Sequence, residues 1–493
     1  MYYFRCIVKT TAIAVIAFLL CGMVYAQEPA VSDFAGTGDI GLKDGPLLKA
    51  TFSLPMGMDF DRDGSMLVVD SYNNRIRRLS KDTVATFAGF SDRKDAYGFP
   101  LAGYADGDAL KAQFNKPRDL VVDSRGNIYV SDTGNNVIRK ILEGKVYTFA
   151  GNGKPGYADG AAGKAQFNCP SGLAVDSSDN IYVADSLNNV IRKITPAGEV
   201  TTYSGKNNSI GGYKDGAALE ARFNEPSDVE INENGDLFVL DSGNQLIRKV
   251  SGSQVSTLYG SRTSILEGTG YYQGGFQDGY GTAARFNFPK GITLADNDVL
   301  LIADTWNHRV RAITPDGKVT TVAGFGTAGK ENGSPSEAKF NGPVSILYKD
   351  GSIYVADMWN SCIRKMPFNP GFIKQYTDIS GISFDTPKAV PQLWYNKTKL
   401  NIPEDSIYFI DDKTMAPLTE ICNALAFKVT AGSDAGTMEI SSGNTSIKFI
   451  ADNEHLIIKD GNITVQLRYL LETFGYNVEW IQKYRAIIIY DPQ

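Results

Sequence analysis

The sequence predicts a mainly β protein in which a six-bladed β-propeller, closed by an N-terminal strand, is followed by a small α+β domain. Three observations lead to this prediction: a strand-rich unit occurs six times, a spare strand precedes the first unit, and the repeat ends near residue 370. The composition agrees, because 50 Gly, 25 Tyr and 25 Phe residues favour short strands and tight turns over long helices.

Each unit begins with a phenylalanine that is followed three residues later by a proline. The six units begin at Phe52, Phe114, Phe167, Phe223, Phe286 and Phe340. In the second unit, apolar runs at residues 128–130, 137–140 and 146–149 follow a first alternating run, so four short strands form one blade. Successive units start 53 to 63 residues apart because each one ends in a glycine-rich insertion.

The two ends of the repeat array complement each other. The sixth unit stops after its third strand at Met366, whereas residues 31–36 precede the first unit as a fourth strand without a blade. We therefore expect this N-terminal segment to complete the blade that begins at Phe340. Such pairing removes the two strand edges that an open array would expose to other chains.

An aspartate in every unit is followed three residues later by asparagine and seven residues later by arginine. The aspartates are Asp70, Asp132, Asp185, Asp241, Asp304 and Asp357, and the arginines are Arg77, Arg139, Arg192, Arg248, Arg311 and Arg364. A residue that every blade requires serves blade geometry, so we predict that these carboxylates bind loop amides and pair with the guanidinium groups. Five insertions also share a Gly-x-x-Asp-Gly pattern, with the aspartates Asp44, Asp106, Asp159, Asp215 and Asp278.

These features resemble the NHL-repeat family of β-propellers over about residues 31 to 369. The proline, the aspartate, the asparagine and an Ile/Val-Arg pair recur in register through all six units. The family includes RNA-binding propellers, a zinc-dependent peptide-amidating lyase and many extracytoplasmic bacterial proteins, so the resemblance implies the fold far more strongly than an activity. The three-histidine zinc site of the lyase cannot form, because His308 is the only histidine of the propeller.

Positions that differ between units are candidates for an asymmetric binding site. The residues two places after the repeat aspartates are Tyr72, Gly134, Leu187, Gly243, Trp306 and Trp359. The large aromatics Tyr72, Trp306 and Trp359 belong to blades one, five and six, which are neighbours in a closed ring. We predict that they form an exposed cluster suited to sugar rings or peptide side chains. The alternative is that they pack beneath the interblade loops.

The position two places after each repeat proline lies at the mouth of the innermost strand. Its residues are Gly57, Asp119, Gly172, Asp228, Gly291 and Ser345. We expect Asp119 and Asp228 to face the central channel, as hydrogen-bond acceptors or, with Asn or water, as ligands of a calcium ion. With Glu230 they leave a metal-dependent, lactonase-like hydrolase as the alternative function, and no other cofactor is expected.

Residues 370–390 are rich in Pro and Gly and predict a linker, after which residues 391–493 form a second domain. Residues 415–429 and 464–480 echo each other, and each segment reads as an amphipathic helix leading to a strand. This pattern resembles the copper amine oxidase N-terminal-like, or stalk, domain of exported bacterial proteins. One arginine and one proline of that family's two signatures are missing, and a generic α+β domain is the alternative.

Amine oxidase chemistry is not expected from this second domain. Copper amine oxidases need three histidine ligands and a tyrosine in a T-x-x-N-Y-[DE] motif that becomes the quinone cofactor. The chain has only His308 and His455 and no such motif, so it lacks the imidazole set that copper favours. We expect the stalk-like domain to bury its leucines against a small sheet and to carry no reactive centre.

Residues 1–26 read as a secretory signal peptide, in which Arg5 and Lys9 precede an apolar run and a small-residue cleavage signal. A membrane anchor and lipid attachment at Cys21 are the alternatives. Cleavage changes the formal charge from −6 to −8, and an acidic chain without a block of Lys or Arg argues against nucleic acid as a partner. The remaining cysteines form no disulfide framework and are Cys169, Cys362 and Cys422.

We therefore expect a monomeric binding or scaffolding protein that is secreted or associated with a bacterial cell envelope. The propeller at residues 27–369 would present one face to a glycan, a peptide or another envelope component. Binding is favoured over catalysis, so no catalytic residue is assigned. No transmembrane segment is expected after the signal peptide is removed.

Overall fold

The computed structural model describes residues 30–207 and 210–370, together with parts of the chain between residues 392 and 490. These parts are residues 392–395, 398–400, 402, 407–410, 413–431, 437–442, 445–450, 456–459, 462–467, 470–471, 474, 477–481 and 486–490. The predicted signal peptide and most of the predicted linker lie outside the described residues. Within the described residues, no helix has the length and apolar character needed to span a membrane.

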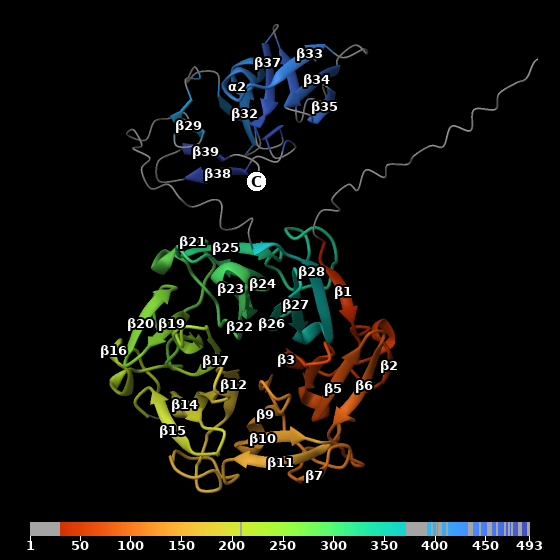
Figure 1. Ribbon diagram of the computed structural model, residues 1–493, viewed down its shortest axis with the longest axis vertical. Coiled ribbons are helices and arrows are strands. Elements are labelled where there is room, and N and C mark those ends of the chain that lie inside the picture. The colour runs from red at the N-terminus through yellow and green to blue at the C-terminus, as the bar shows by residue number, and fades with distance from the viewer. Residues whose placement is uncertain are drawn as a thin grey trace, which may run out of the picture.

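Six antiparallel sheets are arranged as blades around a central axis, as Figure 1 shows. The innermost strands are β3 (Pro55–Phe60), β8 (Leu120–Val122), β12 (Pro170–Val175), β17 (Pro226–Ile231), β22 (Gly291–Ala295) and β26 (Pro343–Lys349). The second strands are β4 (Met66–Asp70), β9 (Ile128–Asp132), β13 (Ile181–Asp185), β18 (Leu237–Asp241), β23 (Val299–Asp304) and β27 (Ser352–Asp357). The six-bladed, mainly β architecture predicted from the repeats is thus confirmed.

The outer half of each blade repeats the same order. The third strands are β5 (Arg75–Ser80), β10 (Val137–Leu142), β14 (Val190–Ile194), β19 (Leu246–Ser251), β24 (Arg309–Ile313) and β28 (Cys362–Pro367). The outer strands are β6 (Thr83–Ala88), β11 (Lys145–Ala150), β15 (Val200–Ser204), β20 (Gln254–Tyr259), β25 (Lys318–Ala323) and, for the sixth blade, β1 (Ser32–Ala35). Two-residue edge strands flank four blades, namely β2 (Gly45–Pro46), β7 (Gly107–Asp108), β16 (Gly216–Ala217) and β21 (Gly279–Tyr280).

The hydrophobic core lies between successive blades. Leu67 and Val69 of blade 1 belong to one buried cluster with Phe114 and Leu120 of blade 2. The phenylalanine that opens each unit is fully buried in all six blades. Blades 6 and 1 share a buried cluster of the same kind, so closure of the ring also covers the outer faces of the first and last blades.

The N-terminal strand closes the ring, as predicted from the repeat pattern. β1 pairs antiparallel with β28, with Ser32 opposite Lys365 and Asp33 opposite Arg364. Figure 1 shows β1 in red beside β28. Four strands therefore complete blade 6, and the edge that β28 would otherwise expose is covered.

The repeat arginines are buried between two carboxylates in blades 1 to 5. In blade 3, Arg192 lies 2.9 Å from Asp185 and 2.5 Å from Asp159 of the glycine-rich loop. Thr202 of the outer strand donates to Asp159 from its backbone N–H (3.0 Å) and its hydroxyl (3.1 Å). The guanidinium also lies over the ring of Phe167 at 5.1 Å. This arrangement gives both terminal nitrogens of a fully buried guanidinium charge-assisted hydrogen bonds.

Blade 6 distributes the same groups differently. Its loop residue is Asn332, whose side-chain oxygen lies 2.5 Å from Nη2 of Arg364. Its outer-strand residue is Asp33 of β1, whose Oδ1 lies 3.0 Å from Nε of Arg364. Asp33 occupies the place opposite the arginine that threonine holds in the other blades. The second carboxylate has therefore moved from the loop to the closing strand.

The described residues of the second domain form three small sheets. The strands are β29 (Gln392–Tyr395), β30 (Thr398–Lys399), β31 (Tyr408–Ile410), β32 (Lys413–Pro417), β33 (Lys428–Ala431), β34 (Thr437–Ser442), β35 (Thr445–Ile450), β36 (Leu456–Lys459), β37 (Asn462–Gln466), β38 (Asn477–Ile481) and β39 (Ala486–Tyr490). Helix α2 (Leu418–Ala424) connects β32 to β33. The two signature segments meet where β32 and β37 pair, with Ala416 opposite Val465. The predicted apolar positions are buried in one core, namely Leu418, Ile421, Leu467, Leu470 and Leu471.

Candidate functional site

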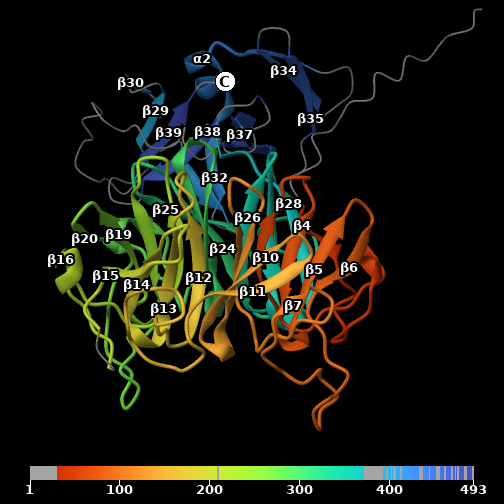
Figure 2. The ribbon, with the colours of Figure 1, turned by 60° about the horizontal axis from the view of Figure 1, so that its bottom comes forward.

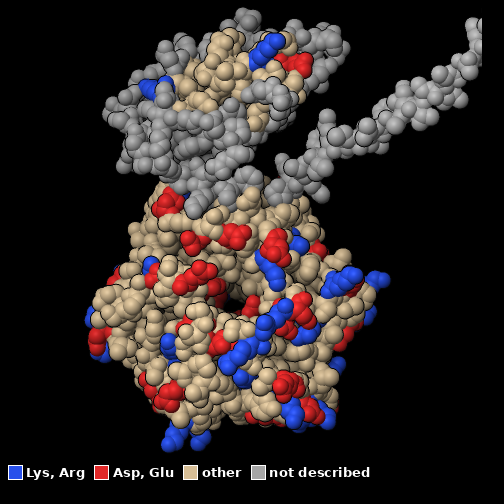
Figure 3. Space-filling model, viewed as in Figure 1, with Lys and Arg blue, Asp and Glu red and all other residues tan. Residues whose placement is uncertain are grey.

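A pocket of about 210 Å³ opens where the six innermost strands begin. Every blade contributes the residue that directly follows its repeat proline, and these residues are Met56, Arg118, Ser171, Ser227, Lys290 and Val344. The next position adds Gly57, Asp119, Gly172, Asp228 and Ser345. The loops after the second strands of blades 5 and 6 add Thr305, Trp306, Met358 and Trp359. The pocket therefore lies on the axis of the ring. Figure 3 shows the other face of the propeller, where acidic and basic side chains lie near a central opening.

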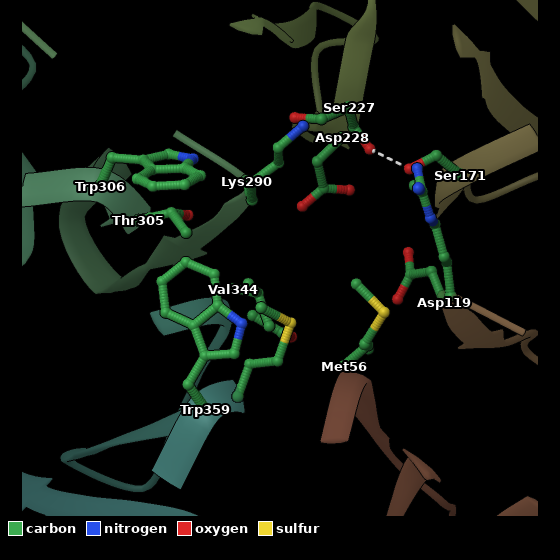
Figure 4. A pocket seen from close by; sticks show the side chains of 15 residues that line it. Met56, Asp119, Ser171, Ser227, Asp228, Lys290, Thr305, Trp306, Val344 and Trp359 are labelled. Carbon is green, nitrogen blue, oxygen red and sulfur yellow. Dashed lines mark hydrogen bonds between the residues drawn. The ribbon is translucent and has the colours of Figure 1, made fainter. Parts of the chain in front are cut away.

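The lining of the pocket is divided into an apolar side and a polar side. In Figure 4, the indoles of Trp306 and Trp359 face Asp119 and Ser171 across the pocket. The Asp228 carboxylate points into the space between these two sides. Methionine and valine side chains from blades 6 and 1 extend the apolar side. A ligand with one apolar face and one polar edge would satisfy both sides at once.

The two tryptophans form an exposed edge-to-face pair. Their ring centroids are 5.3 Å apart at an interplanar angle of 74°. Trp306 is 52% exposed and Trp359 is 38% exposed. The Trp359 ring lies against Gly342, where a β-carbon would come within 2.5 Å of the indole, so glycine is needed for this orientation. His308 supports the same loop, because its Nδ1 accepts the backbone N–H of Gly342 at 3.2 Å.

Tyr72 does not line the pocket with the two tryptophans. Its ring packs edge-to-face on Phe99 at 6.0 Å, and the ammonium group of Lys116 lies 5.3 Å from its centroid. Asn74 fixes the same interblade loop by donating to the carbonyl of Pro100 at 2.9 Å. Figure 2 shows this loop, in orange after β6, projecting from one face of the propeller. The predicted cluster of three aromatics is thus a pair plus a tyrosine that contacts a loop.

Asp119 and Asp228 line the pocket, and both carboxylates also connect neighbouring blades. Asp119 Oδ2 accepts the backbone N–H of Leu173 in blade 3 at 2.8 Å. Asp228 Oδ2 accepts the N–H of Ile292 in blade 5 at 3.0 Å. Asp59, which the sequence analysis did not single out, makes a similar interblade bond two residues further along the strand, from blade 1 to the backbone N–H of Val122 at 2.8 Å.

Glycine and aspartate alternate at this level because the strands converge on the axis. A β-carbon on Gly57 would lie 2.1 Å from Oδ1 of Asp119, and one on Gly172 would lie 2.1 Å from Oδ1 of Asp228. Each aspartate therefore needs a glycine in the preceding blade. This alternation was visible in the sequence, and the structure shows that it serves contacts between neighbouring blades.

Burial raises the pKa values of the carboxyl groups along the channel. The pKa of Asp119 rises to about 7, and that of Asp228 rises well above its usual value, to which the nearby charge of Asp119 adds. Burial likewise raises the pKa of Glu230 to about 8. Across the described residues, no three His, Cys, Asp or Glu side chains come together in a way that would hold a metal ion. Calcium at Asp119 and Asp228 would have to compete with the backbone amides that these oxygens accept.

Two basic residues of the pocket were missed at the sequence level. Arg118 and Lys290 follow the repeat prolines of blades 2 and 5 and line the pocket. Lys290 Nζ lies 3.6 Å from Glu225, which also accepts the hydroxyl of Tyr271 at 2.6 Å. The variation of the residue directly after the repeat proline could have revealed Arg118 and Lys290, because the other blades carry Met, Ser or Val there.

Comparisons with known families identify both parts of the chain. Residues 103–314 match the family model of the teneurin NHL domain. Residues 394–489 match the family model of the copper amine oxidase N-terminal domain. The chain therefore carries an NHL-repeat β-propeller followed by a domain of the copper amine oxidase N-terminal type, as both resemblances implied.

Relatives and solved structures agree on the propeller. Human NHL repeat-containing protein 2 is 30% identical over 357 residues, which cover 66% of this chain and 40% of that protein. The chloroplastic protein suppressor of quenching 1 of Arabidopsis thaliana is 27% identical over 303 residues, which cover 58% of this chain and 28% of that protein. The match thus spans less than half the length of both relatives.

Among solved structures, a protein described as an auxiliary nutrient binding protein from Bacteroides ovatus superposes with a TM-score of 0.51 at 18% identity. The superposition covers 69% of this chain and 76% of the other. A structural genomics protein from Bacteroides thetaiotaomicron gives the same TM-score at 19% identity and the same coverage. At this identity the likeness supports the fold alone.

Proposed function

We propose that the chain is an extracytoplasmic binding protein whose propeller holds a saccharide in the pocket at the start of the innermost strands. The observation that carries this proposal is the Trp306–Trp359 pair, which lies across the pocket from carboxylates and serine hydroxyls. A sugar ring has an apolar face of C–H groups and an edge of hydroxyls. The two sides of the pocket match these two surfaces.

The size of the pocket limits the ligand. Its volume of about 210 Å³ is below the ~300–1,000 Å³ typical of pockets for drug-sized ligands. A terminal sugar unit of a longer glycan fits this limit, whereas a whole oligosaccharide does not. A peptide or another envelope component would contact the same groups, and these ligands are the other outcomes of the screen described below.

A hydrolase is the less favoured function. Asp119 and Asp228, the carboxylates that a lactonase-like site would use, accept backbone amides of neighbouring blades. A metal ligand or a general base would need these oxygens free to face the substrate. Hydrolysis would appear in the binding experiment as turnover of the bound sugar.

Location and assembly are part of the same proposal. The N-terminal pattern of residues 1–26 supports export, and the nutrient-binding description of the Bacteroides ovatus neighbour is consistent with a receptor role outside the cytoplasm. The second domain would act as a spacer or an envelope contact. The protein would act as a monomer, because the proposed pocket is built by one chain.

The test is a screen of the purified mature protein against a glycan array, followed by isothermal titration calorimetry of the best ligands. Changing both Trp306 and Trp359 to Ala should weaken binding by about 2 kcal/mol or more, close to thirtyfold in Kd. Tyr72→Ala is the matched control, because it removes an aromatic from the same repeat position outside the pocket. Unchanged affinity of the double variant would contradict the proposal.

A further inference from the structure

The position after the repeat proline places two positive charges in the pocket. Arg118 belongs to blade 2 and Lys290 to blade 5, so they come from opposite blades of a six-membered ring. Burial lowers the pKa of Lys290, and the positive charge of Arg118 lowers that pKa further. An anion between them would relieve this repulsion.

The carboxylates near these cations balance them only in part. Glu225 forms a long ion pair with Lys290, at 3.6 Å, and shares its charge with the hydroxyl of Tyr271. Within the described residues, ion pairs are found for Lys290 but none for the guanidinium of Arg118. A guanidinium that lines a pocket without a carboxylate partner is suited to bind an anionic ligand.

The two aspartates of the pocket do not supply the missing partner. Their oxygens accept backbone N–H groups of the next blade, at 2.8 Å for Asp119 and 3.0 Å for Asp228. Burial raises the pKa of Asp119 to about 7, so the pair carries less negative charge at neutral pH than two exposed aspartates would. The two aspartates therefore offset the positive charges of Arg118 and Lys290 less than two exposed carboxylates would.

We propose that the ligand is an acidic saccharide whose carboxylate lies between Arg118 and Lys290 while its ring packs on Trp306 and Trp359. This inference rests on the proposed function and names the class of sugar. The planar guanidinium binds a carboxylate through two parallel hydrogen bonds, and the lysine adds a second charge from the opposite side. Uronic acids carry such a carboxylate directly on the ring.

The experiment compares acidic and neutral forms of the same sugars. Digalacturonate and the glucuronate-containing disaccharide of hyaluronan are titrated into the mature protein at pH 7, each beside its methyl ester. We expect at least one acid to bind tenfold or more tightly than its ester. Arg118→Gln should abolish that preference. Lys116→Gln, which removes a charge two residues away outside the pocket lining, should preserve the preference.

The outcomes separate the inference from the proposed function. Equal binding of acid and ester, or an unchanged preference in Arg118→Gln, would overturn the carboxylate assignment while the saccharide site stands. Inorganic phosphate that competes as strongly as the acid would also overturn it, because the site would then recognise phosphate. If no saccharide of either kind binds, the proposed function fails as well. Thermal melting of each variant shows that the fold is retained.

Discussion

The buried Asp–Arg layer and the pocket are made by the same six repeats, but they differ in how far the repeats agree. Each repeat arginine is fully buried and lies 2.6 to 3.0 Å from its repeat aspartate in all six blades. At the pocket, the position after the proline is apolar, basic or a serine depending on the blade. Groups that recur in every blade hold the ring together, whereas groups that vary produce an asymmetric site.

The largest effect should come from breaking the buried layer. Asp185→Ala would leave the fully buried guanidinium of Arg192 with Asp159 as its remaining carboxylate and would remove the acceptor of two loop donors. We expect the free energy of unfolding to fall by about 3–5 kcal/mol, measured by urea denaturation. Asp159→Ala removes the other partner of the same arginine, but this carboxylate is 43% exposed, so its loss should be smaller. Equal losses from the two variants would contradict the account.

A smaller effect is expected where blade 6 departs from the other five. Asp33→Thr would leave Arg364 with Asp357 and an uncharged Asn332, which should cost about 1–3 kcal/mol. Adding Asn332→Asp would recreate the threonine and aspartate arrangement of blades 1 to 5, and it should restore most of the loss.

The measurement for blade 6 is a double-mutant cycle by urea denaturation. Truncation before Thr37, which removes all of β1, serves as the limiting case and should destabilise the ring more than either substitution does. If the double variant is no more stable than Asp33→Thr alone, the carboxylates of loop and strand are not interchangeable and the explanation is wrong.

The channel carboxylates predict a dependence of stability on pH. Burial raises the pKa of Glu230 to about 8, so the unfolded chain releases this proton near pH 4 while the folded chain retains it. The stabilising contribution of the protonated Glu230 is complete below about pH 4 and is lost as the pH rises towards 8. Glu230→Gln should therefore flatten the decline in unfolding free energy between pH 5 and 8 by up to about 1.4 kcal/mol per pH unit. Glu233→Gln, an exposed change on the following turn, should leave the slope unchanged.

Much of the fold was predictable because it depends on local patterns that repeat. The prolines, the apolar alternation and the missing fourth strand after Met366 led to six blades closed by residues 31–36. The composition of the pocket was harder to predict. Whether Tyr72 reaches the pocket depends on how the insertion that carries Phe99 folds over it, and the residues of that insertion around Phe99 do not follow the repeat pattern. Arg118 and Lys290 were missed because a single basic residue carries no pattern of its own.

The most direct test of the central claim needs no ligand. Trp306 and Trp359 are assigned to binding because they vary between blades and remain exposed, so they should contribute little to the stability of the ring. The unfolding free energy of the double variant Trp306→Ala/Trp359→Ala, measured in urea, should lie within about 2 kcal/mol of the wild-type value. A loss of about 3–5 kcal/mol per tryptophan, typical of a buried aromatic, would show that they are core residues and would contradict the separation of a structural layer from a functional pocket.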